Sequence, residues 1–233
     1  MTTGTPDWAE QLRRALDAQV TPHRQAMRRT GESVRQLIER LMATAAPLEA
    51  LEEVAEAVEA LCARLDEHPG GRVLEGFAES ANSGDPHAFF DNSPLMGVSN
   101  PLAPPVELTL DADTVRGRAR FGSAYEGPPG CVHGGYVSAA FDEVLGFAQS
   151  ITGEPGMTGT LTVRYRNPTP LHVDIRFEGQ VERIDGRKIY TVGRAFHGET
   201  LTAEADAVFI RIDFERIARL YDIRRRGGEE LSG

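Results

Sequence analysis

The sequence contains almost no lysine and very little cysteine. Lys188 is the only lysine among 25 basic residues, and the two cysteines, Cys62 and Cys131, have no metal-ligand spacing. Two distant cysteines do not make a disulfide framework, so we expect the protein in the reducing cytoplasm. The spacing of the cysteines does not indicate a metal site, and we expect no cofactor.

Long apolar runs and the common nucleotide motifs are also absent from the sequence. No run approaches the roughly 20 apolar residues of a membrane span, and the polar, acidic start at residues 1–10 does not resemble a signal peptide. The net charge of −10 disfavours nucleic acid and anionic membranes as partners. The sequence has no Gly-x-Ser-x-Gly elbow, phosphate loop or strand-linked dinucleotide fingerprint, which disfavours serine hydrolases and nucleotide-binding enzymes.

The first part of the chain predicts an acidic helical extension over residues 1–70. Thr21-Pro22 has the form of an N-cap followed by proline at the first helical position. Pro47 opens a further helix that carries an apolar stripe and many glutamates. We expect this extension to pack on another element or to dimerise, and we find no catalytic pattern in it. The segment 71–105 is rich in turn signals and is expected to connect it to the main domain.

From residue 106 the periodicity changes to that of an α+β domain, expected over 106–215 and followed by a tail at 216–233. Alternating residues predict a hairpin, then one apolar helix reaching Ser150, then four strands. The expected strands are 106–110, 114–121, 159–165, 171–184, 188–197 and 201–212. A helix this apolar must be buried widely, so one antiparallel sheet is expected to wrap around it. The free edges of such a sheet favour a dimer.

The start of that helix has an unusual composition. Gly134 and Gly135 leave backbone N–H groups uncovered where a helix has unsatisfied donors and a partial positive charge. Asp142 interrupts the apolar run one or two turns later. Donors and a carboxylate on one helix suit acyl transfer, in which an oxyanion is stabilised and a water is activated. Asp142 shares a stripe of small or polar residues with Gly135, Ser138, Gly146 and Gln149.

Three spacings in this region resemble those of a known family. Asp142 lies nine positions after His133, which precedes the two glycines, and Thr158 lies seven positions before Tyr165, which is followed by x-x-Pro168. In these spacings the chain resembles the hot-dog fold acyl-CoA thioesterases, most closely the phenylacetate-degradation (PaaI-like) type, over roughly residues 95–213. Some relatives carry an amide side chain about six positions before the His, and residues 125–127 provide none.

The resemblance implies a role for each candidate residue. Asp142 would be the general base or the nucleophile, the Gly134 N–H the oxyanion donor, and His133 a group that positions the thioester. Thr158 would reach Asp142, or its water, from the other subunit. Apart from the resemblance, the expected substrate-binding residues are Gly135, Ser138, Arg164 and Arg166; the two arginines are candidates for the CoA phosphates, the alternative being a solvated sheet face.

The prediction is therefore a homodimeric or homotetrameric hot-dog enzyme that hydrolyses acyl-CoA thioesters without a metal. Two alternatives remain open from the sequence. One is a hot-dog hydratase or dehydratase acting on acyl thioesters, although the expected His and acid pair is not found. The other is a non-catalytic acyl-CoA sensor or assembly protein, which an appended N-terminal module would favour.

Overall fold

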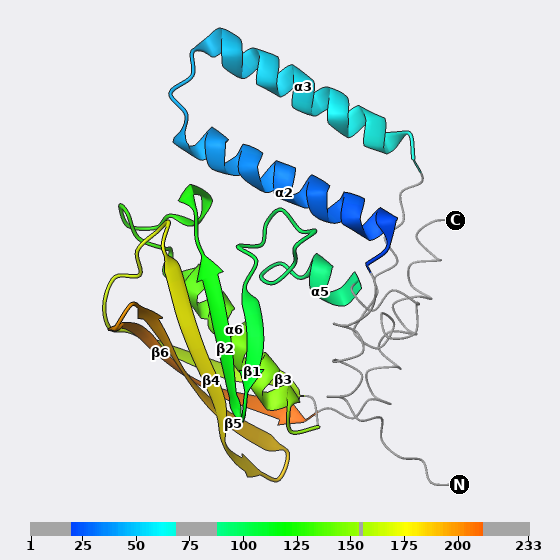
Figure 1. Cartoon of the computed structure of the whole chain (residues 1–233). Helices are drawn as coiled ribbons and strands as arrows, with labels where there is room; N and C mark the ends of the chain where they lie inside the picture. The colour runs from blue at the N-terminus through cyan, green and yellow to red at the C-terminus, as the bar shows by residue number, and fades with distance from the viewer. Residues whose placement is uncertain (1–19, 69–87, 154–155, 212–233) are drawn as a thin grey trace, which may run out of the picture.

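A computed structural model of the chain describes residues 20–68, 88–153 and 156–211 (Figure 1). The helices, in chain order, are α2 (Pro22–Ala43), α3 (Leu48–Asp66), α5 (Ala88–Asn92), the 3₁₀ turn η1 (Ser123–Tyr125) and α6 (Gly134–Ser150). The strands are β1 (Glu107–Asp111), β2 (Thr114–Arg120), β3 (Gly156–Tyr165), β4 (Asp174–Asp185), β5 (Lys188–His197) and β6 (Thr200–Arg211). These bounds confirm the predicted hairpin, central helix and four later strands to within three residues at each end. The expected tail lies outside the described residues.

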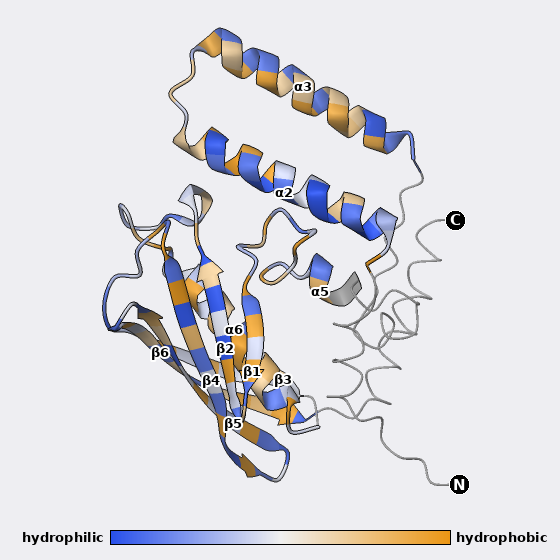
Figure 2. Ribbon diagram, in the orientation of Figure 1, coloured by the Kyte–Doolittle hydropathy of each residue, from blue (hydrophilic) through white to orange (hydrophobic). Residues whose placement is uncertain are grey.

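All six strands form one antiparallel sheet in the order β1-β2-β4-β5-β6-β3. The sheet curves around α6, whose inward side chains are among the most buried in the protein (Figure 1). Apolar and polar residues alternate along the strands, so one sheet face packs on the helix and the other faces outward (Figure 2). β1 and β3 are the two edges of the sheet.

Glycines on the inner sheet face let α6 approach closely. A Cβ atom at Gly117 or Gly179 would lie 2.9 or 2.8 Å from the Val144 side chain. Neither position therefore has room for a larger side chain without moving the helix. Phe141 packs edge-on against Phe177 beside this contact, which fixes the rotation of α6 about its axis.

Helix α2 joins the rest of the protein through its polar face. Arg28 makes two hydrogen bonds to the buried carboxylate of Asp91, at 2.7 and 2.9 Å. Gly31 is buried so tightly that a Cβ atom would lie 2.4 Å from the Ser99 carbonyl oxygen. Several apolar residues of α2 face away from these contacts, and Val34 and Leu41 are exposed. Which surface covers the exposed apolar residues of α2 stays a prediction.

Helix α3 buries none of its residues against the other described parts of the chain. Leu48 and Leu65 are 65% and 69% exposed. The helix lies beyond α2 as the outermost element of the described structure (Figure 1). What α3 packs against, including a second copy of the chain, stays a prediction.

The last turns of α2 support two loops, one before β1 and one before α6. Arg35 donates hydrogen bonds to the Ala103 and Asn100 carbonyl oxygens at 2.8 and 2.9 Å. The Glu39 carboxylate accepts from the Ser123 N–H at 2.7 Å and from its hydroxyl at 2.8 Å. Because Ser123 opens η1 and Tyr125 closes it, α2 holds the turn whose Tyr125 carbonyl oxygen accepts from the His133 N–H.

Replacing Glu39 by alanine should therefore weaken the attachment of the extension. Two donors of Ser123 lose their acceptor, so the free energy of unfolding should fall by about 1–2 kcal/mol. Urea denaturation monitored by far-UV circular dichroism measures this change. Glu52→Ala removes an exposed carboxylate from α3 and should leave the midpoint unchanged. Equal midpoints for both variants would show that the Glu39 contacts contribute nothing.

Candidate active site

The start of α6 is capped by the side chain of His133. Its Nδ1 atom accepts a hydrogen bond from the Gly135 N–H at 3.0 Å. The Tyr136 N–H is satisfied by the His133 carbonyl oxygen at 2.9 Å. In the described part of the chain, the Gly134 N–H is left without an acceptor. This amide is one of the unsatisfied donors that every helix start presents, and it lies at the positive end of the helix dipole.

These contacts divide the two predicted glycines into different roles. Gly135 donates to His133, so its N–H is not available to a substrate in this arrangement. Gly134 keeps the open N–H that an oxyanion site needs. His133 lies at the predicted place, and its structural contribution is that of an N-cap.

Asp142 lies on α6 beside the edge strand β3. Its Oδ1 atom accepts a hydrogen bond from the Thr158 hydroxyl at 2.8 Å. The predicted pairing of these two residues is therefore present, but both belong to the same chain rather than to two subunits. The reason is the short connection: β3 turns back along α6, which brings residue 158 alongside residue 142.

A β-bulge in β3 makes this pairing possible. The register with β6 shifts between Thr158 and Thr160, so Gly159 is an extra residue in the strand. Thr158 and Leu161 consequently both face α6, although three positions separate them and strict alternation would place them on opposite faces.

Gly134 and Asp142 do not converge within one chain. They are separated by eight residues of a continuous helix, which corresponds to about 12 Å along its axis at 1.5 Å per residue. An oxyanion bonded to the Gly134 N–H lies about 3 Å from that nitrogen, so its carbon is out of reach of the same chain's Asp142. The expectation that one helix supplies both groups to one thioester is therefore wrong.

Ser138 and Tyr165 form a second contact between α6 and β3. The Tyr165 hydroxyl lies 2.7 Å from the Ser138 Oγ atom and donates to the Gly134 carbonyl oxygen at 2.7 Å. Sequence reasoning used Tyr165 only to locate Thr158 and gave it no role of its own. The alternation of side chains along β3 could have indicated a role for Tyr165, because Tyr165, Val163 and Leu161 face the helix together.

Arg164 and Arg166 lie on the outer face of the sheet, away from α6. Arg164 pairs with Asp206, and Arg166 donates to Glu204 at 2.8 Å. Because alternate strand residues face opposite ways, two residues that flank the inward Tyr165 must point outward. Their predicted contact with CoA phosphates at this site is therefore not supported by the structure of one chain.

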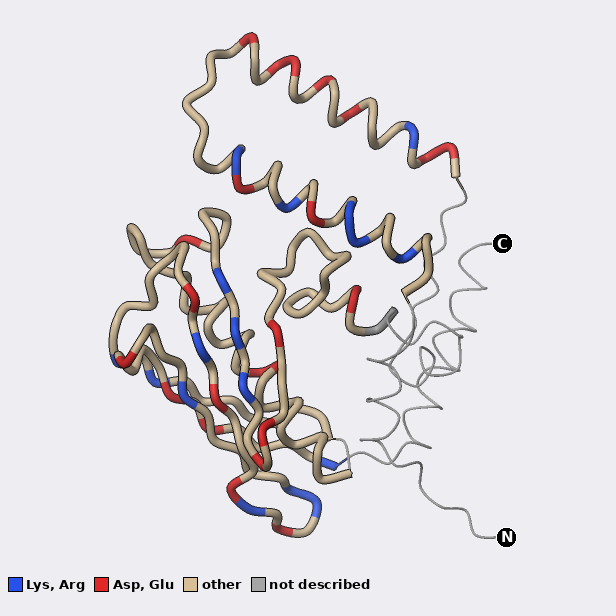
Figure 3. The backbone as a smooth tube through the Cα atoms, in the orientation of Figure 1, with Lys and Arg blue, Asp and Glu red and all other residues tan. Residues whose placement is uncertain are grey.

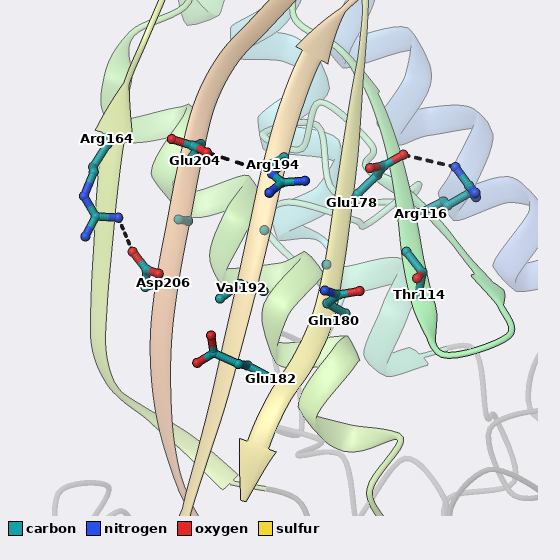
Figure 4. Close-up of a pocket in the computed structure, with 13 residues that line it drawn as sticks. Thr114, Arg116, Arg164, Glu178, Gln180, Glu182, Val192, Arg194, Glu204 and Asp206 are labelled. Carbon is teal, nitrogen blue, oxygen red and sulfur yellow. Dashed lines mark hydrogen bonds and ion pairs between the residues drawn. The ribbon is translucent and has the colours of Figure 1, made fainter.

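The outer face carries a shallow hollow of about 480 Å³ (Figure 4). Arginines and carboxylates alternate across it and neutralise one another, as in the pairs Arg116 with Glu178 at 3.1 Å and Arg194 with Glu204 at 3.9 Å. The same alternation follows the neighbouring strands (Figure 3). Since its cations already have carboxylate partners, this hollow is a poor site for an anionic ligand, and we assign it no role in catalysis.

Glu143, the neighbour of Asp142, points into a different environment. Its Oε1 atom accepts a hydrogen bond from the Ser93 hydroxyl at 3.3 Å. Burial raises the pKa of Glu143 above its ordinary 4.5; the bond from Ser93 opposes the shift, and the nearby Asp142 charge adds to it. Glu143 therefore anchors the loop before β1 and is not placed to share the chemistry of Asp142.

The raised pKa of Glu143 makes a prediction about pH. The folded protein holds this proton more tightly than the unfolded chain, so the free energy of unfolding decreases as pH rises above 4.5 through the folded pKa. Glu143→Gln should match the wild type near pH 4 and be more stable than it from about pH 7 upward. Urea midpoints across this range measure the difference, and a constant gap between the two curves would contradict it.

The residues 20–68, 88–153 and 156–211 contain no cluster of three His, Cys, Asp or Glu side chains that could hold a metal ion. No helix within these same ranges has the length and apolar character needed to cross a membrane.

An antiparallel sheet wrapped around one long helix defines the hot-dog class of proteins. The model of the family described as the thioesterase superfamily matches residues 129–204. A solved thioesterase superfamily protein is 32% identical, covers 79% of this chain and 94% of its own, and superposes with a TM-score of 0.70. The chain belongs to the thioesterase superfamily.

Curated relatives match over a shorter stretch. Acyl-coenzyme A thioesterase THEM4 of Xenopus laevis is 38% identical over 93 residues, which are 39% of this chain and 42% of the relative. Acyl-coenzyme A thioesterase THEM5 of Homo sapiens is 29% identical over 96 residues, which are 40% of this chain and 39% of the relative. The matched stretch thus spans less than half of each of these relatives.

Proposed function

We propose that the protein hydrolyses acyl-CoA thioesters to a free acid and CoA. The observation that carries this proposal is the Thr158 hydroxyl bonded to Asp142 at 2.8 Å, at the exposed edge of a thioesterase-superfamily sheet. The printed activity of the THEM4 and THEM5 relatives supports acyl-CoA as the substrate class. The spacing of His133, Gly134 and Asp142 favours the phenylacetate-degradation type.

The active site would be completed by a second copy of the chain. β3 is an edge strand with exposed residues such as Met157 and Tyr165, and pairing it with its own copy would extend the sheet around a two-fold axis. An antiparallel copy of α6 beside the first reverses its direction, so Asp142 of the second protomer approaches Gly134 of the first. This arrangement removes the separation of about 12 Å along one helix.

In such a dimer the thioester carbonyl oxygen would accept a hydrogen bond from the Gly134 N–H. Negative charge gathers on this oxygen as the carbonyl carbon is attacked, so the amide stabilises the transition state more than the ground state. Asp142 of the other protomer either takes a proton from the attacking water or attacks the carbon itself to form an anhydride. CoA leaves as a thiolate in both routes, and in the second route water then hydrolyses the anhydride.

Thr158 would orient the reacting carboxylate in either route. Its hydroxyl donates to Oδ1, which leaves the Oδ2 atom free to face the water or the carbonyl carbon. A dimer or a dimer of dimers is the assembly we propose. We also propose a cytoplasmic location, because Cys62 and Cys131 are both free thiols and a reducing compartment keeps them so.

The deciding experiment measures free thiol released from a panel of acyl-CoA esters. We expect the purified full chain to release CoA from at least one member and Asp142→Asn to release none above background. An enoyl-CoA included in the panel tests for hydration by mass spectrometry. Binding without thiol release would identify an acyl-CoA sensor, and hydration of the enoyl ester would identify a hydratase; either result would overturn the proposal.

A further inference from the structure

The hydroxyl of Tyr165 contacts the helix turn that carries the open amide. It donates to the Gly134 carbonyl oxygen at 2.7 Å and lies 2.7 Å from the Ser138 Oγ atom. The ring covers Gly134 so closely that a Cβ atom there would lie 3.0 Å from the hydroxyl oxygen. Tyr165 is nevertheless 54% exposed, so it borders solvent or a ligand as well as the helix.

These contacts hold one peptide plane at both of its polar ends. The plane between Gly134 and Gly135 has its carbonyl oxygen bonded by Tyr165 and its N–H bonded by His133 at 3.0 Å. The neighbouring plane carries the Gly134 N–H. The His133 carbonyl oxygen in that plane accepts from the Tyr136 N–H at 2.9 Å. Because two glycines in sequence have the widest backbone freedom of any residue pair, the Tyr165 and His133 side-chain bonds add to this contact in holding the open amide in one direction.

We propose that Tyr165 is a positioning residue that aims the Gly134 N–H at the thioester oxygen. This inference rests on the proposed hydrolase function and adds a residue to it. Tyr165 acts through the Gly134 peptide rather than by proton transfer. Its effect should therefore appear in the transition state, where the hydrogen bond to the developing oxyanion is strongest.

Ser138 gives the turn a second donor. The single Tyr165 hydroxyl hydrogen is directed to the Gly134 carbonyl oxygen, so Ser138 must donate its own hydrogen to the Tyr165 oxygen. A serine in a helix commonly bonds to the carbonyl four residues earlier, which for Ser138 is that of Gly134. When the Tyr165 hydroxyl is removed, Ser138 can rotate and replace it.

The test is a double-mutant cycle with Tyr165→Phe, Ser138→Ala and their combination. Each single variant should lower kcat by about 3-fold, and the double variant by about 100-fold, which is more than the product of about 9-fold because the two hydroxyls substitute for one another in the single variants. KM should change by less than about 2-fold, because the oriented amide binds the neutral thioester oxygen of the ground state only weakly. The pH profile of kcat should keep its shape, because Asp142 is untouched.

Tyr190→Phe is the matched control, since it removes the same hydroxyl from the outer sheet face, where Arg183 stacks on the ring. It should leave kcat and KM unchanged. Circular dichroism melting of all variants reports whether the fold is intact. A Tyr165→Phe and Ser138→Ala double variant with wild-type kcat would overturn the inference, and so would a loss that lies entirely in KM.

The two proposals fail in different ways. If neither the wild type nor any variant releases CoA, the hydrolase function itself is wrong. If the wild type is active and Asp142→Asn is inactive while the double variant keeps full kcat, only the role of Tyr165 is wrong.

Discussion

Asp142→Ala should lower kcat for acyl-CoA hydrolysis by roughly 10³-fold or more, since a positioned base or nucleophile contributes on that scale. The substitution removes the only acceptor that the Thr158 hydroxyl has in the described structure. Asp142 is only partly buried, so the fold should tolerate the change. Discontinuous assays of thiol release, at high enzyme concentration to detect slow turnover, give the rate of hydrolysis.

Two controls separate chemistry from structure in this experiment. Asp142→Asn keeps an oxygen for the Thr158 hydroxyl but removes the charge, and should be as inactive as the alanine variant. Asp206→Ala removes a carboxylate that pairs with Arg164 on the outer face and should keep wild-type turnover. Near-normal hydrolysis by Asp142→Asn would assign the chemistry to another group.

The central helix and its sheet could be predicted because their signals are local. The change from helical spacing to alternation, the turn residues and the glycine pair at the helix start all lie within short windows of sequence. The family spacings then selected Asp142 and Thr158, and the two residues do meet. The outward direction of Arg164 and Arg166 could also have been predicted, because alternate residues of a strand face opposite sides and Tyr165 between them faces inward.

Other contacts could not be predicted because no local pattern encodes them. The β-bulge at Gly159 turns Thr158 toward α6; only the family spacing indicated this contact, because a one-residue shift leaves hardly any trace in composition. Helix α2 packs through Arg28 and Gly31 because Asp91 and Ser99 lie opposite them, more than 60 residues further along the chain. Hydrophobic periodicity assumes that the apolar stripe is the buried one, and here the nearer surface offers carboxylate and carbonyl acceptors instead.

Gly134→Pro should lower kcat by about 10²–10³-fold, the usual cost of losing one oxyanion donor. Proline deletes the N–H and is well suited to the first position of a helix. The preceding residue must be extended, and His133 already has φ −59° and ψ 130°. Gly134→Ala is the matched control, because it adds a Cβ atom beside Tyr165 but keeps the N–H, and it should lose much less activity.

Mixing the two inactive chains tests whether the site is shared between protomers. In a heterodimer of Asp142→Ala with Gly134→Pro, one site receives both substitutions and the other receives neither. Random assembly makes half of the dimers mixed, so the mixture should recover about a quarter of wild-type turnover. Co-expression with two affinity tags isolates the mixed dimer, which should reach about half. Because the two groups are about 12 Å apart on one helix, a mixed dimer without recovered activity would mean that each chain completes its own site by some other donor.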